Sequence, residues 1–309
     1  MIHDLIIIGG GPAGLSCGIY SGRAGNKTLI IEKIGTGGQM MLTDVIDNYP
    51  GFEDGITGFE LQDKMVKQCK KFNVAIEFDD VKSIKLADGI FSVQCENNRY
   101  DSPAVVIASG AKHRQLGVKG EKEFSGRGVS YCGTCDGPFF RDKDVIVIGG
   151  GDSALTEALF ISKFAKSIKV IHRKNRFRAV DSLVELAKKD TKISFVFDTV
   201  VEEIKGDNFV NSVIIKNLLT NEIKEVVAEG VFIFVGLDPN SEFLPDEILD
   251  DKKYIITNSK METSIKGLYA AGDIRSGAFR QVVCATSDGA TAAFYAGEFI
   301  DEIKGRTYK

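Results

Sequence analysis

Two cysteines separated by two residues, Cys132 and Cys135, are the residues whose types and spacing most directly suggest chemistry. Cysteines at this spacing can close a small disulfide, and flanking groups can make one of them a thiolate at neutral pH. Such a pair can also supply half of a zinc site, but no second Cys-x-x-Cys motif or neighbouring Cys/His pair provides the remaining ligands. The pattern therefore predicts a redox-active pair and no metal site.

Asp136 follows the pair directly and is the only carboxylate between Glu123 and Asp142. A carboxyl group beside two thiols can relay protons as the dithiol forms and breaks. The same residue can instead cap the N-terminus of a helix, and both roles stay open. We take Asp136, with Cys132 and Cys135, as a candidate catalytic residue.

A glycine-rich segment near the N-terminus follows an apolar run and precedes a helical pattern. In that order, backbone amides at the helix terminus can face a pyrophosphate, and the missing side chains allow its close approach. Glu32 ends the next predicted strand, where a carboxylate can accept hydrogen bonds from a ribose. These features predict a dinucleotide site and suggest FAD. The candidate contacts are Gly9, Gly11, Pro12, Ala13, Gly14, Glu32 and Lys33.

A second glycine-rich segment begins at Gly149 and has the same order of elements. His172 lies as far beyond Gly149 as Glu32 lies beyond Gly9, and basic residues follow it. A basic cluster at that position suits a ribose that carries a 2′-phosphate, which suggests NADPH, although a charge run can also be a solvated loop. The candidate contacts are Gly149, Gly151, Asp152, Ser153, Ala154, His172, Arg173, Lys174 and Arg178.

The elements that would position these residues form a repeated strand–helix–strand unit. Repeated units of this kind imply parallel sheets covered by helices, so we predict an α/β fold with two Rossmann-like nucleotide-binding domains. The predicted elements are strands at 4–8 and 28–31 with a helix at 12–23, and strands at 145–148 and 168–171 with a helix at 152–164.

The second domain is predicted to be inserted into the first. Polar breaks at 112–116 and 238–242 suggest a two-stranded hinge on either side of it. A hairpin at 81–95 and a meander at 200–234 would form antiparallel flaps, and a long helix would run from 281 to 303. The expected domains are an NADPH domain at 115–241 within a discontinuous FAD domain at 1–114 and 242–309.

Composition narrows the class of protein. The chain of 309 residues is 43% hydrophobic and carries 43 acidic and 39 basic side chains, with no block of five like charges, so we expect no nucleic-acid partner. No apolar stretch approaches the roughly 20 residues needed to cross a bilayer, and the N-terminal run is typical of a strand rather than a signal peptide. We expect a cytoplasmic protein that does not bind membranes.

Motifs along essentially the whole chain resemble those of the low-molecular-weight thioredoxin reductases. The cysteine motif, the basic cluster and the C-terminal motifs are jointly very specific. The matching segments are Gly9 to Gly14, Gly37-Gly-Gln39, Asn48-Tyr-Pro-Gly51, Ala108-Ser-Gly110, Cys132 to Asp136, Gly149 to Ala154, His172-Arg-Lys174, Gly272-Asp273 and Arg280-Gln281.

The resemblance implies a reaction and roles for residues. NADPH would reduce FAD, FAD would reduce the disulfide, and the dithiol would reduce thioredoxin in a homodimeric enzyme. Cys135 would lie nearest the flavin and Cys132 would attack thioredoxin. Because nicotinamide and disulfide must each meet one flavin, we expect a rotation at the hinge. Further FAD contacts would be Gly38, Gln39, Asn48, Gly110, Gly272, Asp273, Arg280 and Gln281.

Two alternatives remain: a flavin disulfide reductase fed by NADH or ferredoxin, and a non-enzymatic flavoprotein redox sensor. Three positions also depart from the family's usual residues. Lys174 replaces an arginine and loses its planar fork, which would weaken the preference for NADPH. Gly133 replaces an alanine between the cysteines, and Pro138 replaces an aromatic residue on the surface expected to face thioredoxin.

Overall fold

The computed structural model describes residues 2–42 and 45–306. The chain divides into two compact units. Unit 1 comprises the residues up to Lys112 and those from Asp238 onward, and unit 2 is the segment His113–Leu237 between them. The connections run as β8 (Ala111–His113) and β17 (Leu237–Pro239), which pair as a two-stranded sheet.

Unit 1 is built on a five-stranded parallel sheet in the order β18-β7-β1-β2-β3. Its central strands are continuous apolar runs buried on both faces, as parallel strands usually are. The strands are β1 (Leu5–Ile8), β2 (Thr28–Glu32), β3 (Ala75–Phe78), β7 (Ala104–Ile107) and β18 (Leu268–Ala270).

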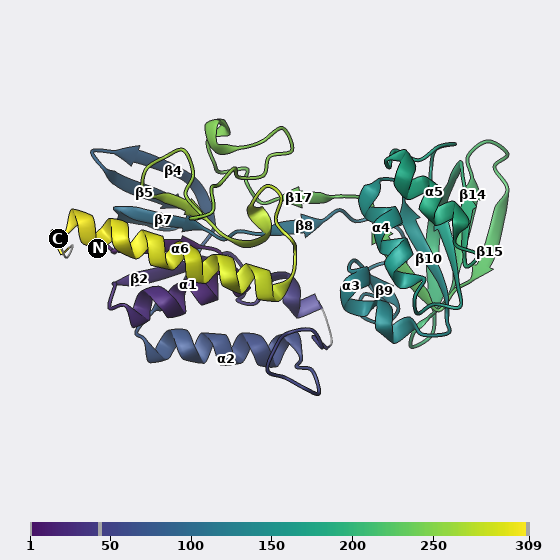
Figure 1. Cartoon of the computed structure of the whole chain (residues 1–309), viewed down its shortest axis with the longest axis horizontal. Helices are drawn as coiled ribbons and strands as arrows, with labels where there is room; N and C mark the ends of the chain where they lie inside the picture. The colour runs from purple at the N-terminus through teal and green to yellow at the C-terminus, as the bar shows by residue number, and fades with distance from the viewer. Residues whose placement is uncertain (1, 43–44, 307–309) are drawn as a thin grey trace. The chain divides into compact units, whose positions relative to one another are not determined.

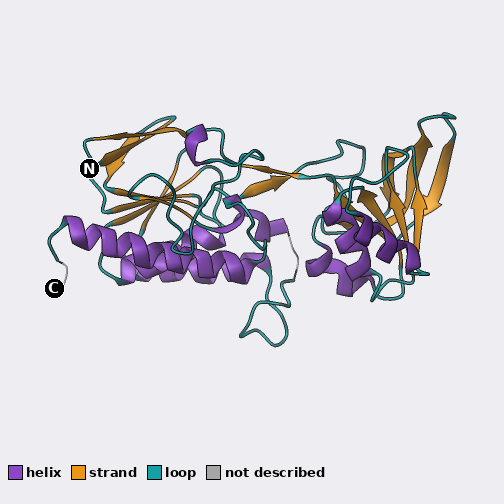
Figure 2. Cartoon of the chain, turned by 45° about the horizontal axis from the view of Figure 1, so that its top comes forward, coloured by secondary structure: helices purple, strands orange, loops and turns teal. Residues whose placement is uncertain are grey.

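Three helices cover one face of this sheet, as Figures 1 and 2 show: α1 (Pro12–Arg23), α2 (Gly58–Lys71) and α6 (Val282–Ile303). Pro12 suits the first turn of α1, where its missing amide hydrogen costs nothing. In α6, Gly289 lets the helix approach α1 closely, because a Cβ there would collide with the Ala13 carbonyl. The Ala- and Gly-rich composition of α6 thus allows it to lie against α1.

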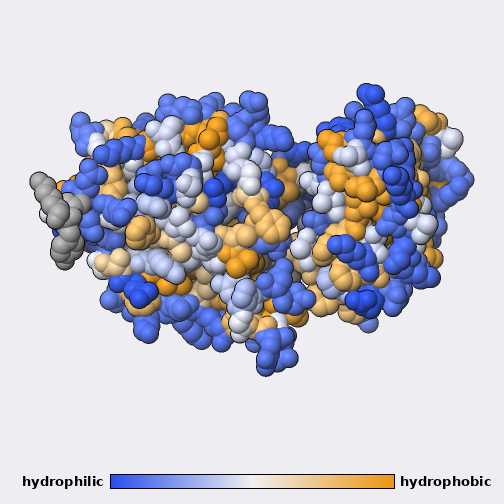
Figure 3. All heavy atoms as spheres, in the orientation of Figure 1, coloured by the Kyte–Doolittle hydropathy of each residue, from blue (hydrophilic) through white to orange (hydrophobic). Residues whose placement is uncertain are grey.

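The other face is covered by an antiparallel sheet of β4 (Val81–Ala87), β5 (Ile90–Cys95) and β6 (Arg99–Ser102). The predicted hairpin is therefore confirmed. Short 3-10 helices complete the unit at η1 (Gly38–Leu42), η3 (Asp246–Ile248) and η4 (Gly272–Ile274). No helix in the described part of the chain is long and apolar enough to cross a membrane, and hydrophilic side chains cover much of the face in Figure 3.

Unit 2 repeats the architecture with a parallel sheet in the order β12-β11-β10-β16-β9. Helices α4 (Asp152–Ile161) and α5 (Asp181–Lys189) pack on it, and α3 (Gly133–Asp136) and η2 (Gly137–Phe140) lie between its first two strands along the chain. The strands are β9 (Val129–Ser130), β10 (Asp144–Gly149), β11 (Ser167–Ile171), β12 (Ile193–Val196) and β16 (Gly230–Phe234). The predicted α/β class is confirmed.

Two predictions for unit 2 were wrong in detail. The antiparallel meander contains only β13 (Thr199–Gly206), β14 (Val210–Asn217) and β15 (Ile223–Val227), whereas β16 pairs in parallel with β10. The apolar run of β16 is buried, so β16 belongs in the parallel sheet that helices cover rather than in the antiparallel flap. Helix α4 ends at Ile161 rather than Phe164, since the Lys163 and Phe164 amides bond three residues back, to the Phe160 and Ile161 carbonyls, and form a turn.

Candidate functional site

The glycines after β1 have two distinct structural roles. Gly9 has φ +110°, and a Cβ on it would collide with the Ala108 carbonyl; one on Gly14 would collide with the Gly9 carbonyl. These two glycines let α1 pack directly after β1. A Cβ on Gly11 would instead meet only the Gly38 Cα, at 4.0 Å, among the described atoms. The N-terminus of α1 therefore faces open space at Gly11, where a phosphate group could approach.

Glu32 lies beside this glycine loop. Its Oε2 accepts a hydrogen bond from the Gly10 amide at 2.6 Å, and its Oε1 accepts one from the Lys33 amide at 2.9 Å. These bonds hold the carboxylate at the end of β2. The Lys33 ammonium pairs with Asp80 at 2.9 Å, so it lies in an exposed ion pair rather than in the loop.

The Asn48 side chain lies against the start of α6. Its Nδ2 donates to Oε1 of Gln281, the N-cap residue of α6, at 3.0 Å. The loop that carries Asn48, residues 47–55, lines a pocket of about 750 Å³. Gln39 is exposed on η1, and Gly110 has φ +67° with open space where its Cβ would lie. The structure thus joins Asn48 and Gln281 directly.

Asp273 and Arg280 are charged groups in a partly buried setting. Burial raises the pKa of Asp273, and the nearby Arg280 opposes this shift. The Arg280 guanidinium lies over the Tyr254 ring at 4.9 Å, and its buried Nε finds no acceptor among the described residues. A shielded guanidinium nitrogen that lacks an acceptor fits a site for a polar or anionic ligand.

The sequence analysis missed two residues that support this region. Asp288 on α6 accepts hydrogen bonds from the Gly272 amide at 3.1 Å and from Arg275 Nη1 at 2.6 Å. The Asp288 and Arg275 side chains are only 17% and 16% exposed, so their pairing holds the Gly272 turn in place. An acid within the Ala- and Gly-rich α6 is the signal that could have revealed it.

In the glycine loop of unit 2, as in that of unit 1, one glycine allows close packing and another leaves open space. A Cβ on Gly149 would collide with the Phe234 carbonyl and the Ala154 side chain, so this glycine and Ala154 serve the packing of α4 on β10. Around Gly151, by contrast, no described atom lies within 4 Å of where its Cβ would be. The Ser153 side chain is exposed in the first turn of α4. The end of α4 beside Gly151 is therefore open to a ligand.

The segment after β11 folds back onto this loop. The Arg178 amide donates to the Gly150 carbonyl at 2.7 Å, and the Val180 amide donates to Asp152 Oδ1 at 2.8 Å. The His172 ring is buried against Gly150, whose Cβ would collide with it.

The burial of His172 determines whether its imidazole carries a positive charge. Burial, with the neighbouring Arg178 and Arg173, lowers the pKa of His172, so the imidazole is neutral at pH 7. Arg173, Lys174 and Arg178 are exposed in the same segment. With Arg176, which is exposed in the same segment, they are the cations available to a phosphate, whereas the His172 side chain is buried.

The two cysteines lie at the start of α3. Cys132 is the N-cap residue and forms a disulfide with Cys135, with a Cα–Cα distance of 5.3 Å. Asp136 Oδ2 accepts a hydrogen bond from Ser130 Oγ at 2.5 Å, and that Oγ also accepts one from the Cys132 amide at 3.1 Å. Asp136 precedes η2, but its side chain makes no capping bond there. A polar link therefore connects Asp136 to Cys132 through Ser130.

No group of three metal-binding side chains is found within residues 2–42 and 45–306. Cys17, Cys69 and Cys95 are free and buried, and burial raises the pKa of each of these thiols. Buried thiols with raised pKa values are poor nucleophiles. Cys284 is free and partly exposed but forms no disulfide, so Cys132 and Cys135 are the one disulfide pair among the described residues.

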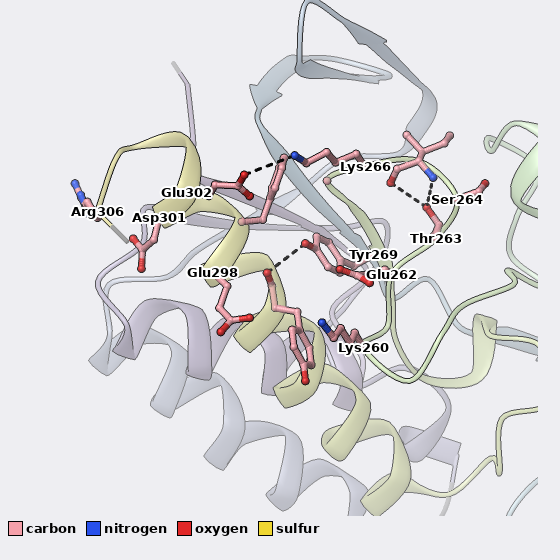
Figure 4. Close-up of a pocket in the computed structure, with 14 residues that line it drawn as sticks. Lys260, Glu262, Thr263, Ser264, Lys266, Tyr269, Glu298, Asp301, Glu302 and Arg306 are labelled. Carbon is pink, nitrogen blue, oxygen red and sulfur yellow. Dashed lines mark hydrogen bonds and ion pairs between the residues drawn. The ribbon is translucent and has the colours of Figure 1, made fainter. Parts of the chain in front are cut away.

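Another pocket of unit 1, of about 790 Å³, contains none of the predicted site residues. As Figure 4 shows, charges of both signs surround it, and Lys266 pairs with Glu302 at 3.9 Å. The Tyr269 hydroxyl donates to the Tyr295 carbonyl at 3.2 Å, and Lys260 lies over the Tyr295 ring. Because its charges are of both signs, the pocket favours no class of ligand.

Comparisons with known proteins agree with this arrangement. Residues 3–289 match the family described as pyridine nucleotide-disulphide oxidoreductase. The chain is 43% identical over 302 residues to a thioredoxin reductase of Treponema pallidum, covering 98% of both chains. It is 41% identical over 305 residues to one of Bacillus subtilis, covering 98% of this chain and 96% of the relative. The solved thioredoxin reductase of Streptococcus pyogenes MGAS5005 superposes with a TM-score of 0.94 at 42% identity, over 97% and 99% of the two chains.

Proposed function

This chain belongs to the pyridine nucleotide-disulphide oxidoreductase family, and from that premise we infer that it reduces the disulfide of thioredoxin with electrons from NADPH. Its full-length relatives at 41–43% identity are thioredoxin reductases. The observation that carries the inference is the Cys132–Cys135 disulfide, held at the start of α3 in the unit that also bears the second glycine loop.

The residues of unit 1 fit FAD. Gly11 and Gly38 leave a space beside the N-terminus of α1 that a side chain would fill, and Arg280 Nε lacks an acceptor among the described residues. Together with Glu32, Asp273 and the residues predicted around them, they would hold the cofactor. FAD supplies the chemistry that accepts a hydride from NADPH and delivers two electrons to the disulfide.

The residues of unit 2 fit NADPH. The open space at Gly151 would receive the pyrophosphate, and Arg173, Lys174 and Arg178 would contact the 2′-phosphate. The flavin-binding residues and the cysteine pair belong to different units, so turnover requires the units to bring them together. A rotation at the linkers remains a prediction.

We assign the exchange steps to the chain's own side chains. Reduction breaks the Cys132–Cys135 bond and leaves two thiols; the Cys132 thiolate then attacks one sulfur of thioredoxin and forms a mixed disulfide. Cys135 attacks Cys132 to release reduced thioredoxin and close the ring again. Asp136, hydrogen-bonded to Ser130, would relay the protons. Phe139 is 49% exposed two residues beyond Gly137 and offers an apolar contact for the partner.

We further propose that the enzyme acts as a homodimer in the cytoplasm. The homodimer rests on the resemblance to the family alone. The cytoplasmic proposal is supported by the free thiols of Cys17, Cys69, Cys95 and Cys284, which are usual in a reducing compartment.

We expect a preference for NADPH over NADH, because Arg173, Lys174 and Arg178 are exposed together beside the second glycine loop. Arg173→Ala should lower kcat/KM for NADPH about tenfold or more, the equivalent of about 1.5 to 3 kcal/mol for a charge-assisted contact, and leave NADH unchanged. Lys189→Ala, which removes an exposed cation of α5, is the matched control. Equal efficiencies for the two nucleotides in the wild type would contradict the assignment.

A further inference from the structure

Glu157 on α4 is a half-buried residue whose carboxyl group the proposed mechanism does not use. Its Oε2 is shielded from solvent and has no hydrogen-bond partner within the described part of the chain. Unpaired buried carboxyl oxygens are uncommon in folded proteins, because desolvation of the charged form is costly. Its position therefore calls for a functional account.

The carboxyl group lies against the turn that carries the disulfide. A Cβ on Gly133 would collide with Glu157 Oε2, so the carboxyl group contacts the backbone between Cys132 and Cys135. Such a Cβ would also lie 3.0 Å from Ile161 Cδ1, which makes the other wall of this space apolar. Thioredoxin reductases usually have alanine at the position of Gly133. Because Gly133 has no side chain, it leaves room for the Glu157 carboxyl group.

The environment of this carboxyl group favours its neutral form. Burial raises the pKa of Glu157 by more than the neighbouring polar groups of Thr134 and Gly133 lower it. The elements packed on α4 bring few other charges, and none contributes to this shift. They are Asp136 of α3, Asp144 of β10, and Asp181, Glu185, Lys188 and Lys189 of α5, whereas η2 and β16 have no ionisable side chain.

We propose that Glu157 is a positioning residue of the redox centre, whose charge beneath the Cys132–Cys135 turn sets how much of the reduced pair is thiolate. Reduction breaks the sulfur–sulfur bond, and the two sulfurs gain two electrons and two protons from the reductant and water. When one thiol then loses its proton to water, an ionised Glu157 opposes the new negative charge. A protonated Glu157 does not. This proposal rests on the proposed function only because it requires the Cys132–Cys135 disulfide to be reduced and formed again.

The test is the pH profile of cysteine alkylation. The FAD-loaded protein is reduced with excess dithiothreitol, freed of it under anaerobic conditions and treated with iodoacetamide, and peptide mass spectrometry follows the pair. Between the pKa of Glu157 and that of the thiol, Glu157→Gln should react about tenfold faster than wild type, since a like charge shifts a thiol pKa by about one unit. The profiles should converge at low pH, where Glu157 is neutral, and at high pH, where the thiol is fully ionised.

Two further variants sharpen the result. Glu185→Gln removes an exposed carboxylate of α5 and should match wild type. Gly133→Ala displaces the carboxyl group without removing it, and its profile should move toward that of Glu157→Gln. Superimposable profiles for wild type and Glu157→Gln would overturn the proposal, even if thioredoxin turnover in the same preparation were normal. Absent turnover with profiles that still differ would contradict the proposed function and leave this inference standing.

Discussion

Cys135→Ser is expected to lose thioredoxin turnover entirely and to capture its partner. The variant retains the attacking Cys132 but lacks the thiol that closes the ring, so the mixed disulfide has no internal route to resolution. A thioredoxin that lacks its own resolving cysteine, supplied with its remaining cysteine as a mixed disulfide with thionitrobenzoate, should therefore accumulate on Cys132 as thionitrobenzoate leaves, as intact mass spectrometry would show. NADPH should still bleach the flavin, because hydride transfer precedes use of the disulfide.

Cys132→Ser provides the contrast. It should also lose turnover and still be bleached by NADPH, but it should not trap thioredoxin. Cys284→Ser removes a partly exposed cysteine outside the motif and should keep full turnover, which controls for thiol loss in general. Trapping by Cys132→Ser alone would reverse the assigned order of attack.

Gly11→Val should give a folded protein without FAD. The Gly11 backbone has φ −76°, which suits valine, and the added side chain would enter space that the described atoms leave open. The substitution should therefore disturb the ligand more than the fold. Purified variant protein should lack flavin absorbance while its circular dichroism matches that of wild-type apoprotein. Gly35→Val, placed at another open glycine outside the motif, should retain its flavin.

Gly151→Val should impair the binding of NADPH without affecting the binding of FAD. Its backbone is also extended and its surroundings are open, so the side chain would occupy the space assigned to the NADPH pyrophosphate. We expect normal FAD content with KM for NADPH raised by at least about tenfold, as expected when backbone contacts to phosphate are lost. If Gly151→Val lost FAD and Gly11→Val kept it, the cofactors would have to be exchanged between the units.

Local patterns explain why most of the fold could be predicted. The helix Pro12–Arg23 begins at a proline after the glycine loop and follows a continuous apolar strand, so propensity and burial agree there. The prediction was wrong at Gly230–Phe234, because a short apolar run has the same sequence pattern in an antiparallel flap as in a parallel sheet covered by helices. Only its pairing with β10 shows which one it joins.

The site residues likewise include some that the sequence reveals and some that only the fold reveals. The glycines and cysteines could be found from sequence because their spacing along the chain is itself the signal. Asp288 and Glu157 could not, since each matters through contacts that folding creates: Asp288 with the Gly272 amide, and Glu157 with the Gly133 backbone. The Lys33 ammonium pairs with Asp80, and a contact of Lys33 with the cofactor stays a prediction.

The central claim, that electrons pass from NADPH through Cys132 and Cys135 to thioredoxin, is tested most directly by stoichiometry in one anaerobic reaction. Purified flavoprotein is mixed with limiting NADPH and excess oxidised thioredoxin, and NADPH absorbance and thioredoxin thiols are measured together. We expect two thioredoxin thiols for each NADPH oxidised, and no catalytic production of thiols with Cys132→Ser or Cys135→Ser. NADPH oxidation without thioredoxin thiols, or equal yields from the cysteine variants, would contradict it.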